Sequence, residues 1–242
     1  MHFERTHHQH IAKALENLDA GLLKTSRCYF GGGTALALMH GEYRESNDID
    51  FMVSSVPDYR HLRALLTGPG GFEMLARPGG TVTQVGDVRA DQYGIRGKIE
   101  IDGVAIKMEI VLEGRIDLEV PAATDTVCGI ATLSQKDLAV EKMLANSDRW
   151  GDVSVFNRDV IDLAMPGFRK PVLMSAIEKA ETAYGVAIRR DLERAIDRVL
   201  NRPGWLDRCI AAMEIREPKA SLMQRMMVLA KACGVPVRLG DA

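Results

Sequence analysis

One stretch of the sequence decides the fold, and it reads Gly31-Gly-Gly-Thr-Ala-Leu-Ala-Leu-Met-His-Gly-Glu-Tyr-Arg-Glu-Ser-Asn-Asp-Ile-Asp-Phe51. Its glycines follow the short run 27–30, which predicts a strand, a tight turn and the start of a helix. Asp48 and Asp50 lie in a second apolar run. Because side chains alternate along a strand, the two carboxylates leave the same face, while Ile49 and Phe51 point into the core.

This arrangement suits a particular kind of ligand. Two carboxylates side by side repel each other unless a cation lies between them, and a hard ion such as Mg²⁺ accepts carboxylate and phosphate oxygens together. Glycines after a strand let backbone N–H groups approach an anion, and the helix that follows adds a favourable dipole. The stretch therefore predicts a site for a metal–nucleoside triphosphate.

On the N-terminal side, apolar residues at three- and four-residue steps predict one amphipathic helix over residues 6–24. His7, His8 and His10 lie at its polar start, and we expect them to be solvated rather than metal ligands, because no cluster of acidic or cysteine ligands accompanies them. On the C-terminal side, Pro57 is expected to open a helix that runs through Leu66.

Residues 82–112 are rich in strand signals, and Asp102-Gly103 between two alternating runs predicts a two-residue hairpin turn. This turn would pair Lys98 with Lys107 and Arg96 with Glu109. Lys107 and Glu109 would then share one polar face of the sheet. Without the upstream aspartates, an ordinary solvated sheet face would be the preferred interpretation of that pattern.

Strand signals fade after Pro121, and helices dominate from Ser134 onward. The predicted fold class is α+β, with a small mixed β-sheet and flanking helices followed by a C-terminal helical domain. We expect an α/β domain over residues 1–120 and a helical domain over residues 121–242. The active site is expected in the cleft between them.

Composition excludes some classes of protein. The chain has 242 residues, and its 31 Lys+Arg against 33 Asp+Glu give a net charge of −2, so the whole surface is not built to bind a polyanion. A local basic patch stays open. Five arginines recur near helical spacing and could form a stripe that binds a nucleic-acid backbone. Acidic residues interleave with them, so a salt-bridged face is the alternative. The arginines are Arg189, Arg190, Arg194, Arg198 and Arg202.

No apolar run is long enough to cross a bilayer, and the N-terminus lacks the layout of a signal peptide. The four cysteines are scattered without a CxxC pair, which is typical of reduced thiols. We therefore expect a cytoplasmic protein with no membrane partner.

The decisive stretch resembles the signature of the polymerase-β-type nucleotidyltransferase superfamily, and more closely that of its AbiEii-like toxin branch. The matching motifs are Gly32-Gly-Thr-Ala-Leu36 and the run from Arg44 to Phe51. Downstream, Ala139-Val-Glu-Lys-Met-Leu-Ala145 and the segment 158–163 also resemble the branch. The resemblance covers residues 28–165, and the gap between glycines and aspartates is longer than in compact superfamily members.

The resemblance implies a third carboxylate on a neighbouring strand, which Glu109 supplies although many members have aspartate there. It implies a catalytic set of Asp48, Asp50, Glu109 and Lys142, of which the three carboxylates would bind Mg²⁺ or Mn²⁺. Lys142 would reach triphosphate oxygens, and Asp159 would orient Lys142 or a second cation. Helix-surface salt bridges are the alternative for Arg158 and Asp159. The residues assigned to nucleotide binding are Gly32, Gly33, Thr34, Arg44, Ser46, Lys107 and Asp159.

The resemblance implies a Mg²⁺-dependent nucleotidyltransferase that moves NMP from an NTP to a hydroxyl of tRNA or another RNA. It would act as the toxin of a toxin–antitoxin pair, with a cognate antitoxin protein as partner. Two alternatives remain. One is a nucleotidyltransferase acting on a small molecule or a protein hydroxyl, and the other is a non-catalytic nucleotide-binding module on the same scaffold.

Overall fold

The alternating residues Asp48–Val53 form strand β2 of a five-stranded sheet in the computed structural model, which describes residues 2–237. The strand order is β1-β2-β5-β4-β3, and only the pairing of β2 with β5 is parallel among these five. The sheet is therefore mixed, as predicted. The other strands are β1 (Tyr29–Phe30), β3 (Thr83–Ala90), β4 (Gly94–Ile101) and β5 (Val104–Leu112).

The predicted hairpin is confirmed. Asp102 and Gly103 both have positive φ, and Ile101 pairs with Val104, which is the geometry of a two-residue turn. The register then places Arg96 opposite Glu109 and Lys98 opposite Lys107.

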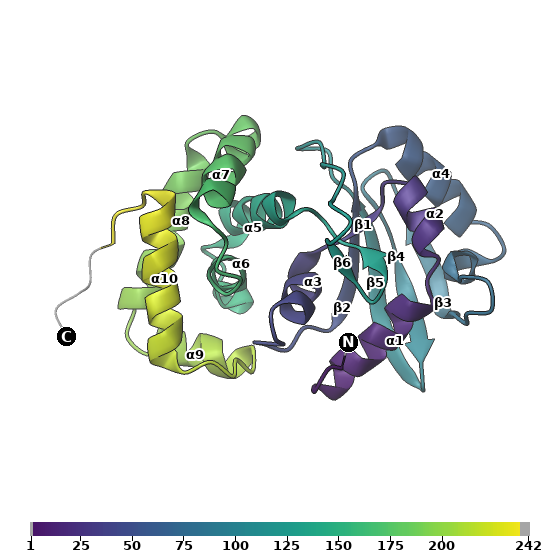
Figure 1. The fold of residues 1–242 in the computed structure, drawn as a ribbon, viewed down its shortest axis with the longest axis horizontal. Coiled ribbons are helices and arrows are strands. Elements are labelled where there is room, and N and C mark those ends of the chain that lie inside the picture. Colours follow the sequence, from purple (N-terminus) through teal and green to yellow (C-terminus); the bar gives the residue numbers. More distant parts are fainter. Residues whose placement is uncertain (1, 238–242) are drawn as a thin grey trace. The chain divides into compact units, whose positions relative to one another are not determined.

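The chain divides into two units. The first comprises residues 1–42 and 46–134, and the second comprises residues 43–45 and 135–242. The sheet belongs to the first unit, where helices α1 and α4 pack on strands β4 and β2, and α3 also packs on β2 (Figure 1). The helical and short strand elements of this unit are α1 (Thr6–Asn17), α2 (Ala20–Thr25), α3 (Gly32–Met39), α4 (Val56–Leu66), the 3₁₀ turn η1 (Gly71–Leu75), β6 (Thr126–Val127) and β7 (Ile130–Ala131).

The expectation of one helix over residues 6–24 is wrong, because α1 ends at Asn17 and α2 begins at Ala20. The side chain of Asp19 accepts a hydrogen bond from the Leu22 amide and so caps α2. The Asp19 amide donates to the Leu75 carbonyl at 2.7 Å, which turns the chain toward η1. Tertiary hydrogen bonding at the break overrides the helical periodicity.

The second unit is helical and is arranged around α5 (Gln135–Arg149), which contacts α6, α7 and α8. Helix α10 packs against the same three helices. The short segment 43–45 joins this unit by backbone hydrogen bonds from Glu45 N to Met213 O and from Arg216 N to Tyr43 O. The remaining elements are η2 (Val153–Val155), α6 (Arg158–Ala164), α7 (Lys170–Tyr184), α8 (Ala187–Asn201), α9 (Trp205–Ala212) and α10 (Lys219–Cys233).

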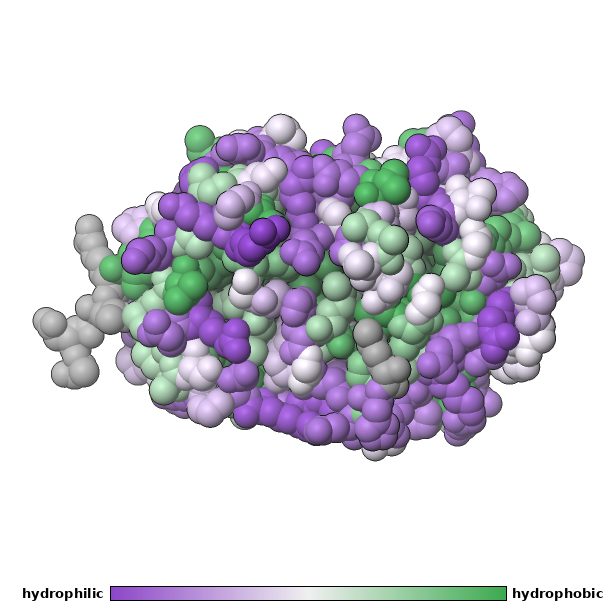
Figure 2. Space-filling model, viewed as in Figure 1, coloured by the Kyte–Doolittle hydropathy of each residue, from purple (hydrophilic) through white to green (hydrophobic). Residues whose placement is uncertain are grey.

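Apolar side chains fill the interior of both units, including Ile49 and Phe51 on β2 and Leu138 and Met143 on α5. Figure 2 shows hydrophilic residues over much of the visible face, with hydrophobic residues in smaller areas. No helix in the stretch 2–237 combines the length and the apolar character needed to span a bilayer.

Candidate active site

Asp48 and Asp50 leave the same face of β2, as predicted, because Ile49, Phe51 and Val53 alternate with them and are fully buried. The parallel register pairs Asp48 with Lys107 and Asp50 with Glu109 on β5. In a parallel pair, residues in register point to the same face of the sheet. One face of the first unit therefore carries three carboxylates and a lysine within two neighbouring strands.

The glycine turn packs directly against Asp50. A Cβ placed on Gly32 would lie 2.6 Å from Asp50 Oδ2, so no larger residue fits there without displacing the carboxylate. Gly32 also has φ +68°, a left-handed conformation that glycine adopts without strain. The Gly31 amide donates to the Asp50 carbonyl at 2.8 Å and fixes the turn to β2. The first turn of α3, with Gly33 and Thr34, thus begins beside the Asp50 carboxylate.

Cations hold the Glu109 carboxylate in place. Arg96 Nε lies 2.9 Å from Glu109 Oε1, and Lys107 Nζ lies 2.9 Å from Glu109 Oε2. Partial burial would lower the pKa of Lys107, but Glu109 and the two aspartates outweigh that effect and raise it. Lys107 therefore stays charged and offsets the repulsion among the carboxylates.

The donor set suits a divalent metal in kind, because carboxylate oxygens are the ligands that hard cations prefer. Nevertheless, among residues 2–237 the structure brings together no group of three or more His, Cys, Asp or Glu side chains that could hold a metal ion. Glu109 is engaged by Arg96 and Lys107 instead. The metal roles of Asp48, Asp50 and Glu109 stay predictions, and that of Glu109 requires its side chain to change partners.

A buried histidine supports the other side of the glycine turn. Thr34 Oγ1 and Ser46 Oγ share a hydrogen bond of 2.8 Å, and the Ser46 amide donates to His8 Nε2 at 3.2 Å. Since Nε2 accepts, the proton of the neutral ring lies on Nδ1, which donates to Glu42 Oε1 at 2.9 Å. This network links helix α1 to two residues that the sequence assigned to nucleotide binding.

The expectation that His8 is solvated is wrong, because its side chain is fully buried. The available signal was its spacing: His8 lies three and seven residues before Ile11 and Leu15, on the apolar face of α1. Burial would raise the pKa of Glu42, but the amides of Glu4 and Arg5 and the ring of His8 outweigh it and hold that pKa below its usual value.

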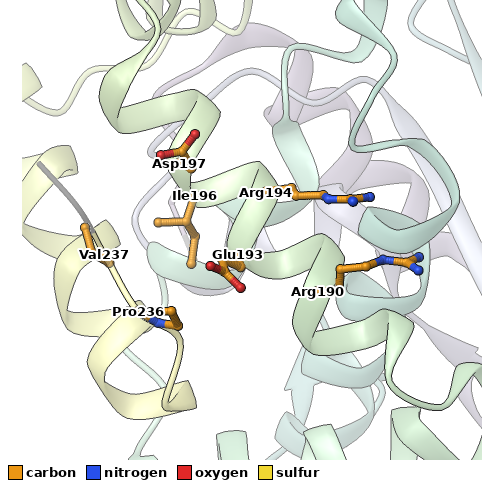
Figure 3. Close-up of a pocket in the computed structure, with 7 residues that line it drawn as sticks. All are labelled: Arg190, Glu193, Arg194, Ile196, Asp197, Pro236 and Val237. Atoms are coloured by element: carbon orange, nitrogen blue, oxygen red, sulfur yellow. The ribbon is translucent and has the colours of Figure 1, made fainter. Parts of the chain in front are cut away.

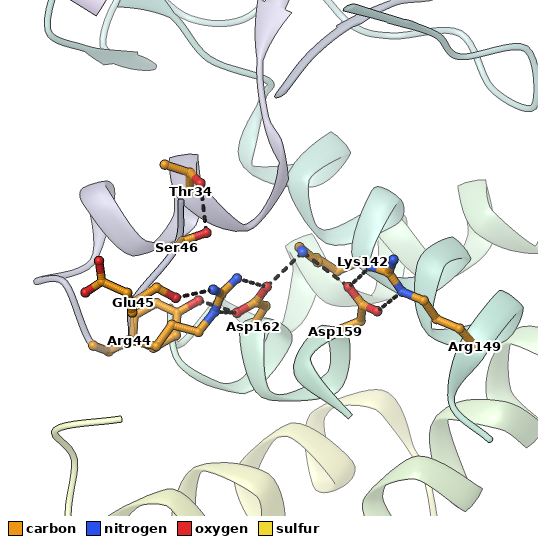
Figure 4. Close-up of polar contacts among 9 residues, drawn as sticks. Thr34, Arg44, Glu45, Ser46, Lys142, Arg149, Asp159 and Asp162 are labelled. Carbon is orange, nitrogen blue, oxygen red and sulfur yellow. Dashed lines mark hydrogen bonds and ion pairs between the residues drawn. The ribbon is translucent and has the colours of Figure 1, made fainter. Parts of the chain in front are cut away.

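Arg44 and Lys142 lie in the second unit and bind carboxylates there. Arg44 donates to both oxygens of Asp162, at 2.6 Å from Nε and 2.8 Å from Nη2. Lys142 Nζ lies 2.8 Å from Asp162 and 3.2 Å from Asp159, and Arg149 binds Asp159 at 2.7 Å. Figure 4 shows these five side chains in a chain of alternating charge.

This ion chain holds three cations and two carboxylates, so it carries one surplus positive charge. Burial alone would raise the pKa of Asp162, but Arg44 and Lys142 outweigh it and hold that pKa well below its usual value. Lys142 has three N–H donors, of which two reach carboxylates. The contacts of Arg44, Lys142 and Asp159 are accounted for within the second unit, and their roles toward a nucleotide stay predictions.

Known proteins resemble the chain both in sequence and in fold. The family model "Nucleotidyl transferase AbiEii toxin, Type IV TA system" matches residues 14–227. The crystal structure of JHP933 from Helicobacter pylori is similar with a TM-score of 0.52 and 13% identity, over 96% of this chain and 94% of that one. A proposed nucleotidyltransferase from H. pylori aligns with a TM-score of 0.47 and 16% identity, over 94% and 95% of the two chains. No curated protein matches the sequence.

Proposed function

Because this chain belongs to the AbiEii family of nucleotidyl transferase toxins, which implies nucleotidyltransferase activity and a cognate antitoxin, we propose that it transfers NMP from an NTP to a hydroxyl of tRNA or another RNA. We further propose that it uses Mg²⁺, or Mn²⁺ in its place. The observation that carries the proposal is the contact of Gly32 with Asp50, which puts a glycine turn and the Asp-x-Asp strand in one place.

In the proposed reaction the acceptor hydroxyl oxygen forms a bond to the α-phosphorus, the bond to the bridging oxygen breaks, and pyrophosphate leaves with the electron pair. Gly32, Gly33 and Thr34 begin helix α3, whose first amides have no partner within the helix and would donate to phosphate oxygens. Asp48 and Asp50 would hold the divalent ion, which would stabilise charge on the phosphate oxygens. Lys107 lies in register with Asp48 and supplies a positive charge on the same face.

Glu109 completes the ligand set or accepts the proton of the acceptor hydroxyl. Either role needs its carboxylate to exchange Arg96 or Lys107 for the new partner. Phosphate oxygens can replace the Glu109 carboxylate as the partner of Arg96 and Lys107, because both cations pair with a triphosphate as well as with a carboxylate. We therefore expect nucleotide binding and release of Glu109 to occur together.

The test is an incubation of the purified protein with each labelled NTP, Mg²⁺ and total bacterial RNA, resolved on a denaturing gel. Label in an RNA band that is lost in Asp50→Asn and in Asp48→Asn supports the proposal. Asp87→Asn, which removes an exposed carboxylate from β3, is the matched control and should keep full activity. Retained transfer in either active-site variant contradicts the assignment.

The same gel separates the alternatives. Label on a protein band or on a small molecule would move the acceptor, and NTP binding without any transfer would favour a binding module. Replacing Mg²⁺ with Mn²⁺, and then adding EDTA, tests the metal. Activity that survives EDTA would contradict the metal role of Asp48 and Asp50.

A further inference from the structure

Four arginines lie against two tryptophans of the second unit, of which Trp205 is buried, and we call this group the arginine–tryptophan surface. The guanidinium carbons of Arg194 and Arg198 lie 5.5 and 4.9 Å from the centre of the Trp150 ring. Those of Arg202 and Arg208 lie 4.8 and 5.1 Å from the centre of the Trp205 ring. Each tryptophan is thus contacted by two guanidinium groups at cation–π distance.

Neutral groups hold most of these arginines. Arg198 donates to the carbonyls of Trp150 and Gly151 at 3.1 and 3.0 Å, and neither acceptor carries a charge. Across residues 2–237, no carboxylate lies within ion-pair distance of Arg198, Arg202 or Arg208. Arg194 has Asp191 at 3.8 Å, an acid that Arg190 already binds at 2.9 Å. Three of the four arginines are therefore outside any ion pair among the described residues.

Two of the acids that interleave with these arginines in the sequence, Glu193 and Asp197, make no ion pair with the four arginines within residues 2–237. Figure 3 shows Arg190 and Arg194 extending from α8 away from Pro236 and Val237, although Glu193 and Asp197 line the same pocket as both arginines. Asp197 instead accepts a hydrogen bond from Asn201 at 2.7 Å. Of the two interpretations that the sequence left open, a salt-bridged face describes Arg189, which binds Glu181 at 2.8 Å, but not Arg198 or Arg202.

Asn157 ties the two tryptophans together. Its Nδ2 donates to the Trp150 carbonyl at 2.9 Å, and Trp205 Nε1 donates to its Oδ1 at 2.8 Å. Phe156 stacks on Trp205 with ring centres 6.0 Å apart. Phe156 and Asn157 both have positive φ, a conformation that costs free energy in non-glycine residues and persists only where the surroundings impose it. The surface is therefore preorganised.

We propose that the arginine–tryptophan surface binds the phosphate backbone of the RNA acceptor, an inference that rests on the proposed transfer to RNA. A guanidinium group stacked on an aromatic ring keeps its N–H edge available, and that edge matches phosphate oxygens bidentately. Arg194 and Arg198 lie four residues apart on α8, a rise of about 6 Å along the helix, and Arg202 follows as its C-cap. Such a row of charges fits a linear polyanion.

The test measures equilibrium binding of bulk bacterial tRNA to the full chain over a series of salt concentrations. The slope of log K against log salt is negative, and each lost phosphate contact should reduce its magnitude by about 0.7 to 0.9. We expect Arg202→Gln/Arg208→Gln to bind tRNA about tenfold more weakly at 0.1 M salt, with the slope reduced by about 1.4 to 1.8. Arg202→Lys/Arg208→Lys keeps the charge and should keep most of the slope.

The matched control, Arg60→Gln/Lys231→Gln, removes two exposed cations from helices outside this surface and should bind like the wild type. Thermal unfolding of each variant verifies that the fold is kept. If the wild type and Arg202→Gln/Arg208→Gln bind tRNA with equal affinity and equal salt slope, the proposed role of this surface is wrong. This holds even if the wild type labels RNA, in which case the proposed function stands. If the wild type neither labels nor binds RNA, the proposed function itself is wrong.

A protein partner is the competing occupant of such a surface, and poly-glutamate serves as its probe. If Arg202→Gln/Arg208→Gln loses poly-glutamate binding but keeps tRNA binding, the surface belongs to an acidic protein and the proposal is wrong. If the variant loses tRNA binding and the labelling of RNA requires proportionally more RNA, with kcat unchanged, the proposal is supported.

Discussion

Asp162 binds Arg44 through both of its carboxylate oxygens, although 118 positions of sequence separate the two residues. Asp162 is fully buried and also accepts hydrogen bonds from Tyr43 and Lys142. A buried charge with this many partners stabilises the fold only while the set is complete. Removing one member leaves the others charged and unpaired in a medium that solvates them poorly.

We expect Asp162→Asn to lower the free energy of unfolding by about 3 to 5 kcal/mol, because Arg44 and Lys142 would lose their shared counter-charge. The measurement is urea unfolding followed by circular dichroism. Asp197→Asn, at an exposed position on α8, is the control and should change stability by less than about 0.5 kcal/mol. Equal stability of the two variants would show that the ion chain contributes nothing.

The pH dependence of stability should follow the same residues. Burial would raise the pKa values of Asp159 and Asp162, but the neighbouring cations outweigh it and lower both. A carboxylate with a depressed pKa stabilises the fold above its unfolded pKa of about 4, and this stability is lost as pH falls through the folded value. We therefore expect the urea midpoint to fall steeply below about pH 4, and less steeply in Asp162→Asn. A parallel decline in both proteins would assign the acid sensitivity to other groups.

Gly32→Ala should abolish nucleotidyl transfer, with at least a hundredfold loss, because its Cβ would displace the Asp50 carboxylate. Gly79→Ala is a closely matched control. Gly79 has φ +73°, similar to the +68° of Gly32, but a Cβ there would meet nothing within 4 Å. Both variants carry a similar conformational strain of about 1 to 2 kcal/mol, so the contact with Asp50 distinguishes them. A similar rate in the two variants would contradict the proposed site.

His8→Leu removes one donor to Glu42, which keeps the amides of Glu4 and Arg5, and leaves the half-buried Ser46 amide without its acceptor. We expect it to lower stability by about 1 to 3 kcal/mol and to raise KM for the nucleotide, since Ser46 contacts Thr34 at the start of α3. His10→Leu, on the same helix, should leave both quantities near wild type. Unfolding curves and steady-state kinetics measure the two effects, and an unchanged KM in His8→Leu would confine His8 to a structural role.

Local patterns in the sequence predicted much of the first unit. Alternation identified the face of β2 that carries Asp48 and Asp50, and the Asp102-Gly103 turn fixed a register that placed Arg96 opposite Glu109. These predictions succeeded because strand alternation and turn chemistry depend on neighbours in the sequence. The family resemblance, which the matching family model bears out, added the activity that periodicity alone does not identify.

Interactions between distant residues could not be predicted in the same way. Nothing near Arg44 in the sequence indicates that it binds Asp162, and no local signal shows that Glu109 has two cationic partners. The break between α1 and α2 depends on a backbone hydrogen bond from Asp19 to Leu75. The burial of His8 is different, because its spacing from Ile11 and Leu15 places it on the apolar face of the helix. The prediction instead gave more weight to the polarity of histidine.

The assignment of residues 43–45 to the second unit has a consequence for how the gene can be divided. A polypeptide that begins at Gln135 contains every helix from α5 onward, yet it lacks Tyr43 and Arg44, two of the groups that bind Asp162. Splicing at one point therefore cannot transplant the second unit intact into another protein. A transfer of the second unit would also have to include residues 43–45, which lie within the sequence of the first unit. The two units are therefore expected to be inherited together.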